Sequence, residues 1–157
     1  MANYIKDIRK KVGHDVVFMP AVGAIIYQNG KILLQKREDD GKWACHGGCM
    51  ELGETYLQTL ERELKEEINI KPIEPKLLGI YSGEKTYHEY PNQDKVYVVW
   101  IAFLVQKYEG ILKIDEDEVL ELKWFELNNL PENISDLDFQ AIKDLTKFLE
   151  NRKVIVH

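Results

Sequence analysis

Residues 48–70 decide how this chain is interpreted, and they read GCMELGETYLQTLERELKEEINI. Thr55, followed three positions later by Gln58, is typical of a helix start, because the two side chains can satisfy the first free backbone amides. Over residues 56–68 the apolar side chains recur at helical spacing. They form one stripe, which consists of Leu57, Leu60, Leu64 and Ile68. The stretch therefore predicts a polar loop that leads into an amphipathic helix.

Three glutamates of this helix, Glu63, Glu66 and Glu67, lie at positions i, i+3 and i+4 beside the apolar stripe. Like charges at this spacing destabilise an exposed helix, typically by roughly a few tenths of a kcal/mol per pair. A divalent cation reverses the sign of that interaction, and Mg²⁺ prefers a few carboxylates plus water and phosphate oxygens. Arg62 has Glu66 at i+4 and Glu54 upstream, so it can hold such ligands in place. From the helix alone, a metal site and an ordinary solvated charged face both remain open.

The register of the whole stretch resembles the Nudix box, which reads G, five residues, E, seven residues, R-E-U-x-E-E-x-G-U with U aliphatic. The matching positions are Gly48, Glu54, Arg62, Glu63, Leu64, Glu66, Glu67 and Ile70. Asn69 stands where the pattern has Gly, and Asn is the next-best residue for the left-handed backbone that ends a helix. Upstream, the residues from Trp43 to Gly48 resemble the family's Trp and Pro-Gly-Gly, with His46 in place of the proline. Downstream, the stretch from Glu121 to Pro131 resembles its acidic, Trp-Phe and Leu-Pro ending.

The resemblance implies an α/β fold, namely a Nudix-type α/β/α sandwich around a mixed β-sheet, formed by residues 1–157 as a single domain with its motif at 48–70. The residue pattern agrees, because runs of strand and helix spacing are interspersed along the chain. Asn29-Gly30 favours a tight hairpin turn between two β-rich runs. We expect helices at 3–12, 56–68 and 136–151, strands at 16–27, 31–37, 76–81, 96–106 and 119–125, and a loop at 39–53.

By the same resemblance, the chain is expected to be a Mg²⁺-dependent pyrophosphohydrolase, with Mn²⁺ as the alternative ion, which cleaves a nucleoside diphosphate linked to another moiety. The resemblance makes Glu63 and Glu67 direct metal ligands. It makes Glu66 a third ligand or the holder of the activated water, and it adds the backbone carbonyl of Gly47. A nucleoside triphosphate, ADP-ribose and a nucleotide sugar all remain open as substrates. The alternatives are a non-catalytic nucleotide-binding module and an isomerase of isoprenoid diphosphates, whose added cysteine and glutamate arrangement is not evident.

A general base is also needed to accept a proton from the attacking water. Glu66, Glu118 and Glu121 are candidates for this base, although for any one member of the acidic run at 115–118 a position in a solvated loop is the simpler interpretation. Arg37 resembles the family's strand-terminal arginine that contacts phosphate or a motif carboxylate, and a plain surface arginine remains the alternative. Tyr81 and the aromatic residues of the connection 82–95 could stack on a base or simply pack a loop.

The composition limits the remaining function classes. The chain has 157 residues, of which 45% are hydrophobic, and this suits one compact core. Its formal net charge of −6 argues against bulk nucleic-acid binding, so we expect a nucleotide-derived small molecule as the partner. No long apolar run or leader pattern is present, which indicates no membrane association and a cytoplasmic location. Cys45 and Cys49 are expected to be free thiols, because they lie too close together to join distant parts of a fold and a chain without a leader should meet a reducing compartment. With His46 they supply only three potential ligands, which is too few for a zinc site. A homodimer is left open.

Overall fold

The computed structural model describes residues 3–157. In chain order, its elements are α1 (Asn3–Val12), β1 (Val17–Gln28), β2 (Lys31–Arg37), β3 (Trp43–Ala44), β4 (His46–Cys49), α2 (Tyr56–Ile68), β5 (Ile70–Ile73), β6 (Lys76–Tyr81), the 3-10 turn η1 (Glu84–Thr86), β7 (Tyr87–Glu89), β8 (Lys95–Val105), β9 (Lys107–Gly110), β10 (Val119–Glu126), α3 (Asp136–Asn151) and β11 (Ile155–Val156). The three predicted helices and the five predicted strands are therefore confirmed, with boundaries that shift by at most a residue or two at their ends.

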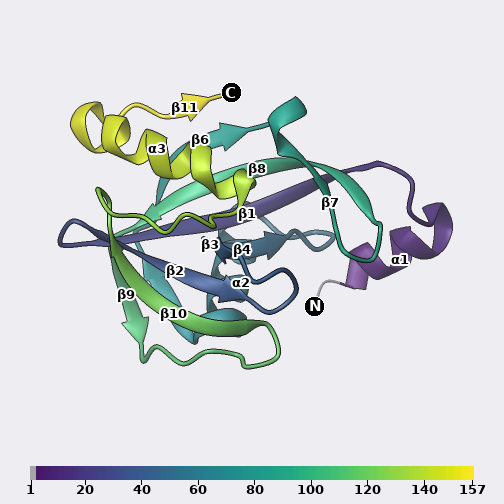
Figure 1. Cartoon of the computed structure of the whole chain (residues 1–157), viewed down its shortest axis with the longest axis horizontal. Helices are drawn as coiled ribbons and strands as arrows, with labels where there is room; N and C mark the ends of the chain where they lie inside the picture. Colours follow the sequence, from purple (N-terminus) through teal and green to yellow (C-terminus); the bar gives the residue numbers. More distant parts are fainter. Residues whose placement is uncertain (1–2) are drawn as a thin grey trace.

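A mixed β-sheet forms the centre of the molecule (Figure 1). The strand order along it is β10-β2-β1-β8-β6-β11, and the short strands β3, β4 and β7 pair with β2, β1 and β8, respectively. β1 and β8 run parallel over most of their length, while β2 is antiparallel to β1. The hairpin between β1 and β2 turns at Asn29 and Gly30, whose φ angles of 50° and 80° are those that a tight hairpin turn requires. β5 and β9 form a separate two-stranded sheet.

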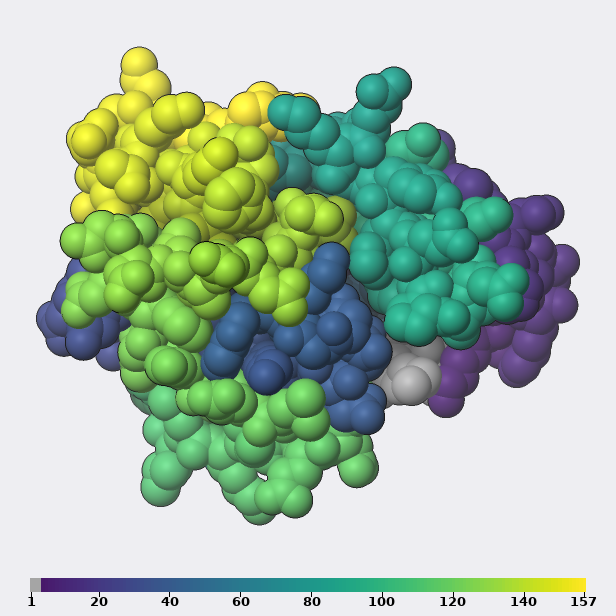
Figure 2. All heavy atoms as spheres, viewed as in Figure 1, coloured from purple at the N-terminus to yellow at the C-terminus, as the bar shows by residue number. Residues whose placement is uncertain are grey.

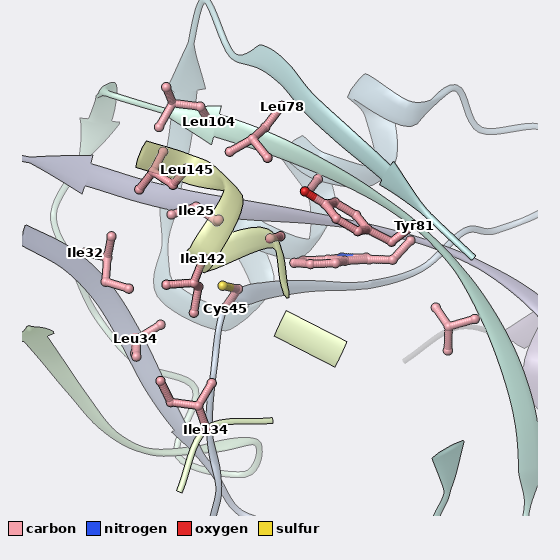
Figure 3. Packing of buried hydrophobic residues seen from close by; sticks show 14 of the residues in the cluster. Ile25, Ile32, Leu34, Cys45, Leu78, Tyr81, Leu104, Ile134, Ile142 and Leu145 are labelled. Carbon is pink, nitrogen blue, oxygen red and sulfur yellow. The ribbon is translucent and has the colours of Figure 1, made fainter. Parts of the chain in front are cut away.

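Helices cover both faces of this sheet, which makes the predicted α/β/α sandwich. α3 lies in front of the sheet in Figure 1 and α2 lies behind it. Ile142 and Leu145 of α3 face sheet residues such as Ile25 and Leu34 in the first core cluster (Figure 3). On the other face, α2 packs its apolar residues against β1, β2 and β8 in a second cluster, to which it contributes Leu60, Leu64 and Ile68. Within residues 3–157 no helix is both long and apolar enough to cross a membrane.

Two local expectations are wrong. Residues 39–53 are not an unbroken loop, because β3 pairs with β2 and β4 pairs with β1 inside them. These strands are too short and too rich in glycine to show a period of two, and their partners define them. Leu57 does not join the packed stripe but is 51% exposed. It belongs to the first turn of α2, where all of residues 55–58 are exposed, so this end of the helix extends beyond the packed face.

Candidate active site

The helix α2 starts where its sequence predicts. The side-chain hydroxyl of Thr55 accepts a hydrogen bond from the backbone amide of Gln58, and the Gln58 side chain accepts one from the Thr55 amide. At the other end Asn69 adopts a left-handed conformation with φ 61°, as expected for the residue that replaces the family's glycine. Both ends of α2 are thus fixed by local chemistry, and this sets which side chains face the sheet.

The buried side of α2 contains carboxylates as well as leucines. Glu63 and Glu67 are 9% and 6% exposed, whereas Glu66 lies at the rim, with 47% of its side chain exposed. Thr59, Glu63 and Glu67 follow one another at intervals of four residues and form a buried row beside the apolar stripe. α2 therefore places two of its three motif glutamates against the sheet and the third at the rim.

Arg62 joins the loop before α2 to the glutamates of the helix. It donates hydrogen bonds from Nε and Nη2 to the two oxygens of Glu54, at 2.7 and 2.9 Å. Its Nη1 lies 2.5 Å from Glu63 Oε1 and 3.3 Å from Glu66 Oε2, and its Nη2 also donates to the carbonyl of Cys49 at 3.0 Å. The hydrogen bonds from Arg62 to Glu54 are the main cause that lowers the pKa of Glu54 to about 2. The expected contacts of Arg62 with Glu54 and Glu66 are both present.

Glu67 has no such cationic partner among residues 3–157. Its Oε1 accepts a hydrogen bond from Gln35 Nε2 at 2.8 Å, and its Oε2 accepts one from the backbone amide of Gly47 at 2.9 Å. His46 Nδ1 is 3.9 Å away, but burial lowers the pKa of His46 to about 4, so this ring is neutral. Burial is also the main cause that raises the pKa of Glu67 to about 8, and the charge of Glu63 adds to it. A buried carboxylate with neutral partners is an unfavourable place for negative charge unless a cation binds.

Two glycines of β4 make room for these carboxylates. A Cβ atom on Gly48 would lie 2.6 Å from the carboxyl carbon of Glu63. Gly47 has φ 141°, and a Cβ there would lie 2.2 Å from the carbonyl oxygen of Val22. His46 beside them is buried, with Nε2 3.2 Å from the carbonyl oxygen of Leu33, so a side-chain contact holds this loop where the family pattern has proline. β4 can therefore approach α2 closely enough for Gly47 to bind Glu67.

A cleft of about 350 Å³ opens beside Glu67. It is lined by Gln35, Arg37, Glu38, Asp39, Glu67, Tyr90, Asp117 and Glu118. The structure thus brings Arg37 and Glu118, two of the predicted site residues, to the same cleft as Glu67. Arg37 forms a two-pronged ion pair with Asp39, from Nε to Oδ1 at 2.9 Å and from Nη2 to Oδ2 at 2.6 Å. In Figure 2, the blue residues of β2 and the loop after it lie between the teal segment around residues 80–95 and the yellow-green start of α3.

Two predicted site residues lie elsewhere. Glu121 is paired with Lys36, on the face of the sheet opposite Gln35 and α2, because a bulge at Leu120 shifts the register of β10 by one residue. Tyr81 is 3% exposed and packs in the first core cluster, where its ring stacks near Trp100 and His157. Neither residue lines the cleft beside Glu67. Tyr81 therefore occupies a core position and not the cleft beside Glu67.

One residue of this site, Gln35, was not selected from the sequence, and Tyr90 was expected only as one of several aromatic residues of the connection 82–95 that could stack on a base. Gln35 is a polar side chain in the otherwise apolar run Ile32–Gln35, and a buried amide of this kind needs partners. Tyr90, rather than Tyr81, is the aromatic residue of the 82–95 connection that reaches the cleft. The signal for Gln35 is visible in the sequence, whereas nothing in the composition of the connection distinguishes Tyr90 from its aromatic neighbours.

The donor set suits a hard cation such as Mg²⁺, because it consists of carboxylate and backbone oxygens. Across residues 3–157 no three His, Cys, Asp or Glu side chains form a ready-made cage for a metal. Arg62 holds Glu63 and Glu66 instead, so a metal here would take few protein ligands and complete its shell with water and phosphate, as Mg²⁺ usually does. Cys45 and Cys49, which flank the glycines of β4, are both free thiols.

The architecture and the carboxylate-bearing helix define a class of protein, and comparisons with known proteins identify it. The family model of the NUDIX domain matches residues 17–145. An ADP-ribose pyrophosphatase from Methanocaldococcus jannaschii is 37% identical over 132 residues, which cover 82% of this chain and 73% of that protein. An RNA pyrophosphohydrolase from Pelagibacter ubique is 31% identical over 137 residues, which cover 77% of this chain and 84% of that protein.

The solved structures agree on the fold. The crystal structure of a MutT NUDIX hydrolase from Burkholderia pseudomallei superposes with a TM-score of 0.71 at 24% identity, and covers 82% of this chain and 98% of that one. The chain belongs to the NUDIX family. It is a Nudix hydrolase, an enzyme that acts on phosphoric anhydride bonds, as residues 48–70 indicated.

Proposed function

We propose that this enzyme hydrolyses a nucleoside diphosphate linked to a second moiety, with Mg²⁺ or Mn²⁺ as its cofactor. The observation that carries the proposal is Glu67, a buried carboxylate with only neutral hydrogen-bond partners, next to the second buried carboxylate Glu63. They are two acids buried where water cannot solvate their ionised forms, and a divalent cation bound between them would stabilise both carboxylates. ADP-ribose is the first substrate to test, because the M. jannaschii relative is named for it.

In this proposal Glu63 and Glu67 hold the metal, with Glu66 and the carbonyl of Gly47 as further ligands. A bound divalent ion polarises a phosphoryl oxygen and lowers the pKa of an attacking water. Arg62 orients Glu63 and Glu66 through the hydrogen bonds described above. Arg37 faces the cleft and binds phosphate oxygens once its fork exchanges Asp39 for the substrate. Glu118 or Glu66 accepts the proton of the water.

The test is metal-dependent release of AMP from ADP-ribose, followed by chromatography, with 8-oxo-dGTP and a 5′-triphosphorylated RNA as further substrates. Glu67→Gln keeps the shape of the side chain but removes its charge. It should lower the rate by more than about 100-fold, because losing even a group behind a metal ligand costs about 10- to 100-fold.

Glu61→Gln is the matched control, since Glu61 is exposed on the same helix and forms a 3.9 Å ion pair with Lys71 at the surface. It should stay within about two-fold of the parent, as surface substitutions usually do. No Mg²⁺-dependent turnover of any compound would favour the nucleotide-binding module. Equal rates for both variants would show that the catalytic carboxylates lie elsewhere.

A further inference from the structure

Gln35 is a buried polar residue on a strand that is otherwise apolar at its centre. It is 3% exposed, while its neighbours Ile32, Leu33 and Leu34 are between 0% and 2% exposed. Its side chain lies on the face of β2 that is covered by α2, opposite the face that packs against α3. Burying an amide is unfavourable unless its hydrogen bonds are made, so its contacts show what the position does.

Those contacts fix the amide in one orientation. Nε2 donates to Glu67 Oε1 at 2.8 Å and to the carbonyl of Cys45 at 3.3 Å. The carbonyl of Cys45 can only accept a hydrogen bond, so the NH₂ end of the amide must face it, and the same end reaches Glu67. The carbonyl Oε1 of Gln35 has no hydrogen-bond partner among residues 3–157. The amide therefore donates to the carboxylate while its own carbonyl oxygen is left without a hydrogen bond from residues 3–157.

Glu67 is consequently held at both of its oxygens. Gln35 donates to Oε1 from β2, and the amide of Gly47 donates to Oε2 from β4 at 2.9 Å. Two donors from two different strands fix the plane of the carboxylate. Each carboxylate oxygen has two lone pairs, so one remains on each oxygen for a metal.

Gln35 is a neutral hydrogen-bond donor to a carboxylate, whereas Arg62 is a positively charged one. A guanidinium neutralises a carboxylate that it binds through both oxygens, as Arg62 does for Glu54. A positive partner at Glu67 would compete with a cation for the same charge, whereas an amide orients the carboxylate and leaves its charge available. We propose that Gln35 is a positioning residue, which holds Glu67 in the orientation that binds the divalent metal. This inference rests on the proposed function only for the identity of the metal ligand.

The test is the affinity of the metal-free protein for Mn²⁺ alone, measured by the EPR signal of the free ion. Gln35→Met replaces the amide by an apolar side chain of similar size and removes the donor. We expect it to weaken Mn²⁺ binding by about 10- to 100-fold, the usual effect of removing a partner behind a metal ligand. In turnover, the Mg²⁺ concentration for half-maximal rate should rise, while kcat at saturating Mg²⁺ changes much less.

Leu34→Met is the matched control, because Leu34 is equally buried on the same strand but faces the other core cluster. It perturbs the packing of β2 without touching Glu67, and should leave Mn²⁺ affinity unchanged. If Gln35→Met does not fold, as shown by circular dichroism, Gln35→Asn takes its place. Its amide is one methylene shorter and cannot span the same gap, so the same weakening is expected.

The outcomes separate this inference from the proposed function. Unchanged Mn²⁺ affinity in the folded Gln35 variant overturns the positioning role, even if the enzyme hydrolyses ADP-ribose. Weaker Mn²⁺ binding in a protein that hydrolyses none of the substrates supports the role of Gln35 and overturns the proposed reaction. Equal weakening in Gln35→Met and Leu34→Met overturns the inference as well, because it assigns the effect to strand packing.

Discussion

Each face of the central sheet buries two carboxylates, and the most buried one on each face, Asp144 and Glu67, are stabilised differently. Asp144 of α3 is 1% exposed, and its oxygens have Gln140, His157, Tyr81 and Lys147 within 3.0 to 3.4 Å. Burial pushes the pKa of Asp144 up, but the hydrogen bonds from Gln140 and His157 outweigh it and the pKa is lowered. Glu67 of α2 is 6% exposed and has only Gln35 and a backbone amide as hydrogen-bond donors among residues 3–157, and its pKa is raised to about 8.

The difference shows that burial of an acid is not by itself the mark of a site. Asp144 has partners that satisfy its negative charge, so this carboxylate needs no cation from outside the chain. Glu67 has partners that orient its carboxylate but do not neutralise it, so without a cation it keeps its proton up to a pH of about 8, and its ionised form is stabilised when a cation binds.

The largest expected effect concerns the general base. Glu118 lines the cleft beside Glu67, and Glu121 projects from the opposite face of the sheet. We predict that Glu118→Gln lowers kcat on the order of 100-fold, the usual contribution of a positioned base, with a smaller change in KM. Glu121→Gln should stay within about two-fold of the parent. Steady-state kinetics at saturating Mg²⁺ measures both.

The opposite order of effects would contradict this assignment of the base. If Glu121→Gln lowers kcat more than Glu118→Gln does, the general base does not lie in the cleft beside Glu67. If neither substitution lowers kcat, Glu66 is the remaining candidate for the base, because it lies at the exposed rim of α2, the helix that carries Glu67.

The placement of Glu118 and Glu121 illustrates what the sequence could and could not predict. The register of the motif and the cap at Thr55 and Gln58 determine α2, because helix ends and helix faces follow from local spacing. The face occupied by Glu121 depends on one extra residue, the bulge at Leu120, and a shift of one residue reverses the faces of a strand. No local pattern announces such a bulge.

The sequence also did not predict which individual side chains are buried. Tyr81 is an aromatic residue at the end of a strand, a position equally compatible with a binding surface and with the core. Its core position follows from α3 and from β11, which returns to pair with β6 beside it. The two short strands of the loop 39–53 exist because β1 and β2 offer backbone partners to them, and no pattern within the loop itself indicates that pairing.

The second prediction concerns the pH dependence of stability without metal. An isolated glutamate has a pKa of 4.5, and Glu67 in the fold has a pKa of about 8. Between these values the unfolded chain has released this proton and the native protein still holds it, so its contribution to the free energy of unfolding falls as pH rises. Over this window we expect a loss on the order of a few kcal/mol, and Glu67→Gln should remove it.

Urea unfolding in EDTA at several pH values from about 5 to about 9 measures this loss. Added Mg²⁺, in buffer without EDTA, should restore the stability of the parent protein at the alkaline end, because it binds the ionised carboxylate of the native state only. It should have no such effect on Glu67→Gln. Parallel pH profiles for the parent and the variant would contradict the raised pKa of Glu67.

The last prediction is for the α3 face. Asp144→Asn keeps the size of the side chain but replaces one of the two accepting oxygens by an NH₂ group, which donates hydrogen bonds instead of accepting them. Because hydrogen bonds to charged groups contribute about 1.5–3 kcal/mol, we expect the free energy of unfolding at neutral pH to fall by a similar amount. Affinity for Mn²⁺ and the rate of hydrolysis should not change.

The pH dependence of this loss has the opposite sign to that of Glu67. The folded pKa of Asp144 lies below its ordinary value of 3.8, so its contribution is present above that pH and disappears as the carboxylate becomes protonated. Asp136→Asn is the matched control, since Asp136 is on the same helix with a side chain that is 93% exposed. If Asp144→Asn weakened Mn²⁺ binding as Glu67→Gln does, the two faces would not differ in the way the partners of their carboxylates indicate.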